Sequence, residues 1–304
     1  MSSAAERSAV VFAYHQVGVR GLRALAACGV DVRLVVTHRD DPAERIWFDS
    51  VARTADEMGV PWIAPDDPME ALARLRACAP RFLFSLYYRH MLKAPLLGAA
   101  REAYNLHGSL LPKYRGRAPV NWVVIRGEAE TGATLHVMDE KPDHGAVVDR
   151  MAVPILPDDT AADVFAKVVV AGEIVLVRSV PRLIDGSAVL SAQDFTQGSY
   201  FGGRRPEDGR IPHDASAAAI HNLVRGVSAP YPGAFFDSRA GRVSVWRSAR
   251  SPRRGAAAER FSLQADGGAV WLVAADGAML RIVRAELDGQ PLAGDHPALP
   301  LSPR

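Results

Sequence analysis

The chain has 304 residues, of which 48% are hydrophobic and 23% are charged, and its formal net charge is +2. These values are ordinary for a globular protein, and the length suggests about two domains. The balanced charge gives no general attraction to nucleic acid or to anionic membranes. No apolar run approaches the roughly 20 residues that cross a bilayer, and the N-terminus lacks the pattern of a signal peptide. We therefore expect a cytoplasmic protein with no stable membrane insertion.

The first part of the chain alternates short β-rich runs with helix-like runs. We expect strands at 8–15, 31–38, 60–64 and 81–88, and helices at 18–28, 45–58 and 69–78. This alternation favours an α/β fold with a mostly parallel sheet and helices on both faces. Ligands of such sheets bind beyond the carboxyl ends of the strands. His15, His38, Tyr88 and His107 are expected there.

The remainder of the chain changes character. We expect a helix from Pro119 to Arg126, paired strands at 131–138 and 146–155, and helices at 160–184 and 215–227, the last capped by Asp214. From Gly233 the period becomes two, with strands at 234–237, 243–247, 269–273 and 279–283, which predicts a small antiparallel barrel. The basic run 247–254 is interpreted as a solvated loop. The expected domains are a catalytic domain (1–190), a linker with a helix (191–230) and a barrel (231–304).

The most informative motif is Asn105-Leu-His-Gly-Ser-Leu-Leu-Pro112, where an apolar run gives way to a Gly-Ser turn. Residues i and i+2 of a strand point the same way, so Asn105 and His107 are expected to project together from one strand end. A carboxamide donor and an imidazole suit the polarisation of a carbonyl and the transfer of a proton. Asp143 follows in a loop after a second strand-like run.

This set of groups can catalyse acyl transfer to an amine. A positioned N–H donor stabilises an oxyanion by roughly 3–4 kcal/mol, and a carboxylate near His107 would orient the ring. Ser109 lacks the G-x-S-x-G setting of a nucleophile and is interpreted as a turn residue or a donor. The Gly18-Val-Arg-Gly21 turn is not a dinucleotide fingerprint. His and Cys do not cluster at zinc-ligand spacing, so we predict no metal.

The 105–112 motif, with Asp143 downstream, resembles the signature of folate-dependent formyltransferases. The resemblance covers nearly the whole chain and implies a Rossmann-like catalytic domain followed by an OB-like barrel. It also implies that 10-formyltetrahydrofolate is the co-substrate and that a primary amine receives the formyl group. The branch of the family that acts on UDP-4-amino-4-deoxy-L-arabinose is the most similar in the runs 11–15, 87–90, 105–119 and 201–208. The reaction of that branch is a step in the lipid A modification that gives polymyxin resistance.

The resemblance also implies roles for individual residues. Asn105 and Asp143 would support the transition state, and His107 would be the proton donor. The folate pocket would be edged by Arg89, His90, Met91, Arg117, Asp139, Glu140, Lys141, Pro142 and Asp143. Arg204, Arg205 and Arg225 are candidates for the acceptor's diphosphate. His213 stands where relatives carry tryptophan, which puts the local shape of the acceptor side in question.

Three alternatives stay open. Another sugar-nucleotide N-formyltransferase would share the chemistry. So would a methionyl-tRNA formyltransferase, although the stretch 37–45 is short and balanced in charge, and binding of tRNA needs several Lys or Arg contacts. A folate-binding regulatory protein without turnover would have no need for the intact trio of Asn105, His107 and Asp143. We expect small-molecule partners and no nucleic acid, and the sequence predicts no oligomeric state.

Overall fold

The computed structural model describes residues 4–42 and 46–304 and divides into two compact units. The first unit comprises Met1–Pro119, Glu130–Val153 and Ala166–Phe201, and the second comprises Val120–Ala129, Pro154–Phe165 and Gly202–Arg304. The functional domain boundaries expected at 190 and 230 stay a prediction.

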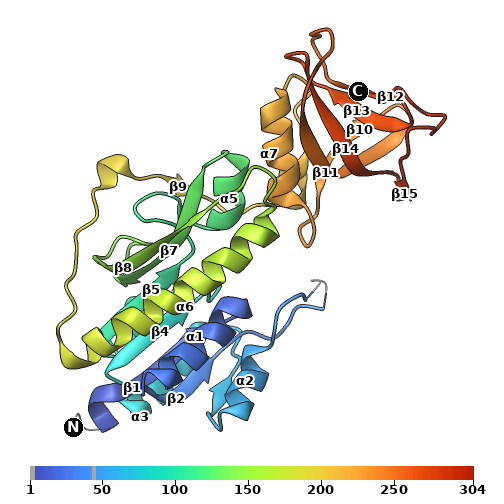
Figure 1. Cartoon of the computed structure of the whole chain (residues 1–304). Coiled ribbons are helices and arrows are strands. Elements are labelled where there is room, and N and C mark those ends of the chain that lie inside the picture. Colours follow the sequence, from blue (N-terminus) through green and yellow to red (C-terminus); the bar gives the residue numbers. More distant parts are fainter. Residues whose placement is uncertain (1–3, 43–45) are drawn as a thin grey trace. The chain divides into compact units, whose positions relative to one another are not determined.

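The first unit is built on a seven-stranded sheet with the order β3-β2-β1-β4-β5-β7-β8 (Figure 1). Its strands are β1 (Ser8–Ala13), β2 (Asp31–Val36), β3 (Trp62–Ile63), β4 (Phe82–Leu86), β5 (Glu102–His107), β7 (Glu130–Val137) and β8 (Val147–Pro154). The pairs from β3 to β5 are parallel, and β7 runs antiparallel to β5. The α/β fold class with a mostly parallel sheet is therefore confirmed.

Helices cover both faces of this sheet (Figure 1). They are α1 (His15–Ala27), α2 (Val51–Glu57), α3 (Leu72–Cys78), α4 (Ala94–Leu97) and the long α6 (Ala161–Asp185), which runs through both units. The helix expected at 45–58 is shorter, because Ser50 caps α2 by accepting from the Arg53 N–H; Arg45 lies outside the described residues. In the described ranges, no helix has both the length and the apolar character that a membrane span requires.

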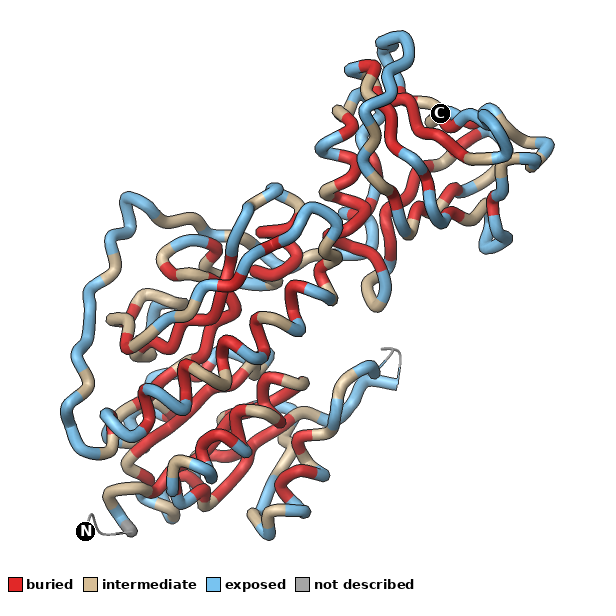
Figure 2. Tube along the Cα trace, viewed as in Figure 1, coloured by how far each residue is buried: buried red, intermediate tan, exposed pale blue. Residues whose placement is uncertain are grey.

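The strands of this sheet are long apolar runs because both faces are covered. All six residues of β1 are buried, which Figure 2 shows as a red strand in the middle of the unit. Small residues let the helices approach: a Cβ added at Gly21 of α1 would lie 2.5 Å from the Leu86 side chain. A Cβ added at Gly172 of α6 would lie 2.9 Å from the Leu106 side chain. The packing fixes β4 and β5, whose carboxyl ends carry the predicted site.

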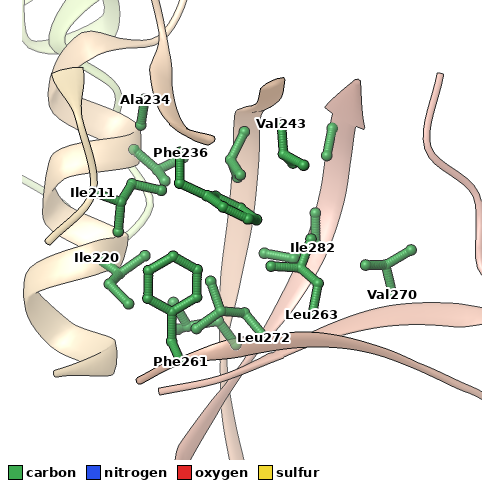
Figure 3. Close-up of a cluster of buried hydrophobic side chains, with 14 of the residues drawn as sticks. Ile211, Ile220, Ala234, Phe236, Val243, Phe261, Leu263, Val270, Leu272 and Ile282 are labelled. Carbon is green, nitrogen blue, oxygen red and sulfur yellow. The ribbon is translucent and has the colours of Figure 1, made fainter. Parts of the chain in front are cut away.

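The second unit contains an antiparallel sheet with the order β10-β11-β14-β13-β12, and β15 pairs with β14. The strands are β10 (Ala234–Ser238), β11 (Gly241–Arg254), β12 (Ser262–Asp266), β13 (Ala269–Val273), β14 (Ala278–Leu287) and β15 (Gln290–Pro291). α5 (Pro119–Ile125) lies largely in this unit, and so does α7 (Ala217–Val227). Figure 3 shows the core, in which Phe236 and Phe261 meet edge to face at 4.9 Å.

Three sequence expectations for this unit need correction. Ser216, not Asp214, caps α7, because its side chain accepts from the Ala219 N–H. The basic run 247–254 is part of β11 and not a loop. Its pairing with β14 outweighs the charge, since the basic side chains lie at the surface and Ser248 is the buried residue of the run. The strand β12 was not expected at all.

Close strand approach at Gly132 of β7 leads to a stability prediction. A Cβ at this position would lie 2.0 Å from the carbonyl oxygen of Met151 in β8, so Gly132→Ala must push the two strands apart. We expect a loss of about 1–3 kcal/mol in the free energy of unfolding, measured by urea denaturation. Gly202→Ala is the control, because nothing lies within 4 Å of its added Cβ. Equal stability of the two variants would contradict the strand packing described above.

Candidate active site

Strand β5 presents Asn105 and His107 at the carboxyl edge of the sheet. Its partner β7 runs antiparallel, with His136 opposite Asn105 and Thr134 opposite His107. Directly opposite side chains on an antiparallel pair share one face and lie close together. Two residues from each strand therefore face the same region, and β7 contributes a second imidazole to it.

Both ring nitrogens of His107 have partners, and the side chain is 7% exposed. Nε2 lies 2.8 Å from the main-chain oxygen of Tyr114, which can only accept, so Nε2 carries a hydrogen. Nδ1 lies 3.5 Å from Oδ1 of Asp143. A proton on Nδ1 therefore faces the Asp143 carboxylate.

Asp143 lies in the loop between β7 and β8 with φ = 57°, a left-handed conformation that is unusual for a residue with a Cβ. Its Oδ2 accepts from the Gly116 N–H at 2.8 Å, and its Oδ1 lies 3.5 Å from Nε2 of His136. Burial alone would raise the pKa of Asp143. The charge of His107 and the Gly116 N–H outweigh burial and hold that pKa well below its usual range.

His136 is the site residue that sequence reasoning missed. Its Nδ1 lies 2.8 Å from the Val137 carbonyl oxygen and therefore carries a hydrogen, which makes Nε2 an acceptor in the neutral ring. The amide nitrogen of Asn105 lies 3.1 Å from this Nε2. His136 thus fixes which way the Asn105 carboxamide faces, and the second N–H of that amide stays available to a ligand. Strand pairing is the signal that could have identified His136, because the antiparallel register places it opposite Asn105.

The turn after β5 is held by hydroxyl groups. Ser109 Oγ donates to the Lys113 carbonyl oxygen at 2.7 Å, and Thr134 Oγ1 donates to the Ser109 carbonyl oxygen at 2.7 Å. Ser109 is fully buried. These bonds agree with the interpretation of Ser109 as a donor in a turn, and they aim the Tyr114 carbonyl at His107.

Aromatic and imidazole rings gather at the ends of β1, β2 and β4. His38 stacks on Tyr88 with ring centres 4.1 Å apart, and its Nε2 accepts from the Arg89 N–H at 3.1 Å. Burial, with His90 and Arg89, lowers the pKa of His38 to about 4, so the ring is neutral and can accept. Tyr87 bounds the site itself, because a Cβ at Gly108 would lie 3.7 Å from its ring.

The residues that the resemblance assigns to folate lie around this edge. Arg89, His90 and Met91 follow β4 and are exposed, as are Arg117 and the 139–142 stretch. Arg89 also lies over the Tyr14 ring, at 4.7 Å from its centre. Their assignment to folate stays a prediction. In the part of the chain that the structure describes, no group of three or more His, Cys, Asp or Glu side chains could hold a metal ion.

The candidates for the acceptor's diphosphate lie in the second unit. Arg204 stacks on Trp122 at 4.5 Å and donates to the Asp208 carbonyl oxygen, and Arg205 is exposed. Arg225 is 5% exposed and donates to Asn222 and to the main chain of Asp159. Arg225 therefore has partners within its own unit.

The low pKa of Asp143 links it to stability. The carboxyl group binds a proton more readily in the unfolded chain, so the ionised form stabilises the fold above the unfolded pKa of about 3.9 and this contribution fades as the pH falls below it. We expect Asp143→Asn to lower the free energy of unfolding at pH 5–7, and the difference from wild type to shrink below about pH 4. Urea unfolding at several pH values measures this, with exposed Glu140→Gln as control. A difference that does not vary with pH would contradict the assignment.

His136→Leu tests the orientation of Asn105. Without Nε2 the carboxamide can rotate, and misplacement of a catalytic group costs about a hundredfold in rate. We expect kcat to fall by about this factor with KM little changed, while the melting temperature stays close to that of the wild type. His296→Leu, a half-buried histidine of the C-terminal unit, is the control. A His136→Leu enzyme with the kcat of the wild type would show that Asn105 needs no such partner.

The chain is similar to known proteins. The sequence model of the formyl transferase family matches residues 16–180, and that of the formyl transferase C-terminal domain matches residues 204–295.

Solved structures share the fold. An N-formyltransferase from Helicobacter canadensis, in complex with folinic acid and dTDP-3-aminofucose, is 19% identical with a TM-score of 0.71, over 94% of this chain and 99% of that one. The sugar 3N-formyl transferase WlaRD, in the presence of dTDP and 5-N-formyl-THF, is 19% identical with a TM-score of 0.71, over 94% and 97%. A glycinamide ribonucleotide transformylase from Symbiobacterium toebii is 20% identical with a TM-score of 0.53, over 62% and 94%.

At these identities the solved structures show the fold alone. The two family matches go further, because the first covers more than half of the chain and includes Asn105, His107 and Asp143, and the second covers most of the barrel unit. The chain therefore belongs to the formyl transferase family and is a formyltransferase.

Proposed function

We propose that the protein transfers the formyl group of 10-formyltetrahydrofolate to the 4-amino group of UDP-4-amino-4-deoxy-L-arabinose. The observation that carries the proposal is one buried cluster at the carboxyl edge of the sheet, in which His107 Nδ1 meets Asp143 Oδ1 at 3.5 Å and Asn105 meets His136 at 3.1 Å. Because the proposed acceptor is a soluble sugar nucleotide, a cytoplasmic location is part of the proposal.

The reaction forms one bond and breaks one. The neutral amine attacks the formyl carbon, the new C–N bond forms, and the bond between that carbon and N10 of the folate breaks. The second N–H of Asn105 stabilises the oxyanion, a contribution of roughly 3–4 kcal/mol for one positioned donor. His107 protonates the departing nitrogen from Nδ1, and the proton that the attacking amine loses passes to the vacated His107 nitrogen. Asp143 orients the ring and stabilises its charged form.

The folate is proposed to bind beside β4 and the 139–143 loop. Exposed Arg89 and Arg117 supply positive charge for the carboxylates of its glutamate tail. The neighbours with folinic acid and 5-N-formyl-THF support a folate co-substrate. For the acceptor's diphosphate, Arg204 and Arg205 are more accessible candidates than Arg225, because Arg225 is buried among its own partners.

A second candidate acceptor is another sugar nucleotide. It is favoured by the two neighbours that are similar over nearly their whole length, since one was crystallised with dTDP-3-aminofucose and the other with dTDP. Both candidates use the same transfer chemistry and differ in the base and in the position of the amine.

An acceptor panel decides between them. Tetrahydrofolate release is measured with UDP-4-amino-4-deoxy-L-arabinose, with dTDP-linked 3- and 4-amino sugars, and with charged initiator tRNA. We expect the UDP sugar to give a kcat/KM at least about tenfold above the others, since one unpaired polar group costs about 1–3 kcal/mol. His107→Ala should lower kcat by about a hundredfold or more. A preference for a dTDP sugar or for tRNA would overturn the acceptor, and an unaffected His107→Ala enzyme would overturn the mechanism.

A further inference from the structure

One segment of the first unit contacts both loops that surround His107 and Asp143. We call residues 191–201, between α6 and the end of β9 (Tyr200–Phe201), the strap. The two loops are 112–117, which carries the Tyr114 carbonyl and the Gly116 N–H, and 143–147, which carries Asp143. Neither loop belongs to the seven-stranded sheet over most of its length, so its conformation depends on other contacts.

The strap pairs with the 112–117 loop through its backbone. Ser199 donates its N–H to Pro112, accepts from the Arg115 N–H at 3.0 Å, and accepts with Oγ from the Tyr114 N–H at 2.9 Å. Strand β6 (Arg115–Gly116) then pairs with β9. The Phe201 ring stacks on the Tyr114 ring, with centres 5.0 Å apart and planes 10° from parallel. The partners of His107 and Asp143 are thus held by one short ladder.

The strap holds the 143–147 loop mainly through one side chain. Gln193 Nε2 donates to the main-chain oxygens of Asp143 at 2.9 Å and of Gly145 at 2.7 Å. Ser191 and Val147 exchange two backbone bonds, at 2.8 and 2.9 Å. The Phe195 ring stacks on His144 at 4.4 Å. Both amide hydrogens of Gln193 are used, whereas its Oε1 is buried with no hydrogen-bond partner among the described residues.

The two loops need such support because both are strained. Tyr114 has φ = 58° and Asp143 has φ = 57°. A left-handed conformation costs a residue with a Cβ roughly 1–2 kcal/mol, and it persists where surrounding contacts determine it. The strap bonds to the backbone of both residues, so it supplies the contacts that offset the strain.

From these contacts we infer that Gln193 is a positioning residue for formyl transfer, which holds the Asp143 backbone so that its carboxylate meets His107, His136 and the Gly116 N–H. The inference rests on the proposed function, in which Asp143 acts through His107. Gln193 itself touches no reacting atom. The charged and titratable groups around Asp143 are His107 on β5, His136 on β7, and Arg115 and His144 in the loops.

Two variants of Gln193 and one control test this. Gln193→Ala removes both donors, and Gln193→Glu keeps the size but sets a carboxylate against two carbonyl oxygens. We expect kcat to fall by about ten- to a hundredfold in both, with KM for both substrates little changed. The acid limb of the kcat–pH profile should move to higher pH, because Asp143 loses the contacts that keep its pKa low. Gln197→Ala changes an exposed glutamine of the same strap and should behave like the wild type.

A second measurement separates this inference from the proposed function. The Asp143 carboxyl group can be titrated by ¹³C NMR in the free protein, which requires no turnover. We expect its pKa to rise in Gln193→Ala and to stay low in Gln197→Ala. If the wild type transfers no formyl group, the proposed function fails while this titration still tests the strap. If the wild type is active and the Gln193 variants retain its kcat, or if the Asp143 titration does not move, the inference fails.

Discussion

The burial of the Asp143 carboxylate is the constraint on which the site depends. A charge with a side chain only 11% exposed must be compensated by hydrogen bonds and opposite charge, or it will take up a proton. The compensation comes from β5 through His107 and from β6 through the Gly116 N–H. The carboxylate therefore stays ionised only when both of these separate pieces of chain are in place.

The antiparallel pairing of β7 with β5 gives the site its second imidazole. The register of this pair places His136 directly opposite Asn105 and Thr134 opposite His107. In the proposed reaction β5 supplies Asn105 and His107, and β7 supplies His136, which orients Asn105.

Much of this could be predicted from the sequence, and most of the failures share one physical cause. Long apolar runs in the sequence predict the strands β1, β2 and β4. A spacing of two residues within a strand predicts that Asn105 and His107 lie on the same face. Local patterns do not predict His136, Gln193 and the extent of β11, because each is determined by a partner distant in sequence. Asn105 and His136 are 31 residues apart, and Gln193 and the Asp143 carbonyl are 50 apart. Nothing local in the sequence marks such pairs.

Non-local contacts of this kind also hold the candidate site groups in one arrangement. Asn105, His107 and Asp143 could in principle be brought together by many scaffolds, but the contact between His136 and Asn105 and a left-handed backbone at Asp143 each exclude alternative conformations. The free energy that burial of β1, β4 and β5 provides is large compared with the strain of about 1–2 kcal/mol at each loop residue. The core of the sheet can therefore stabilise loop conformations that would not persist alone, and the candidate site lies where those loops meet the sheet edge.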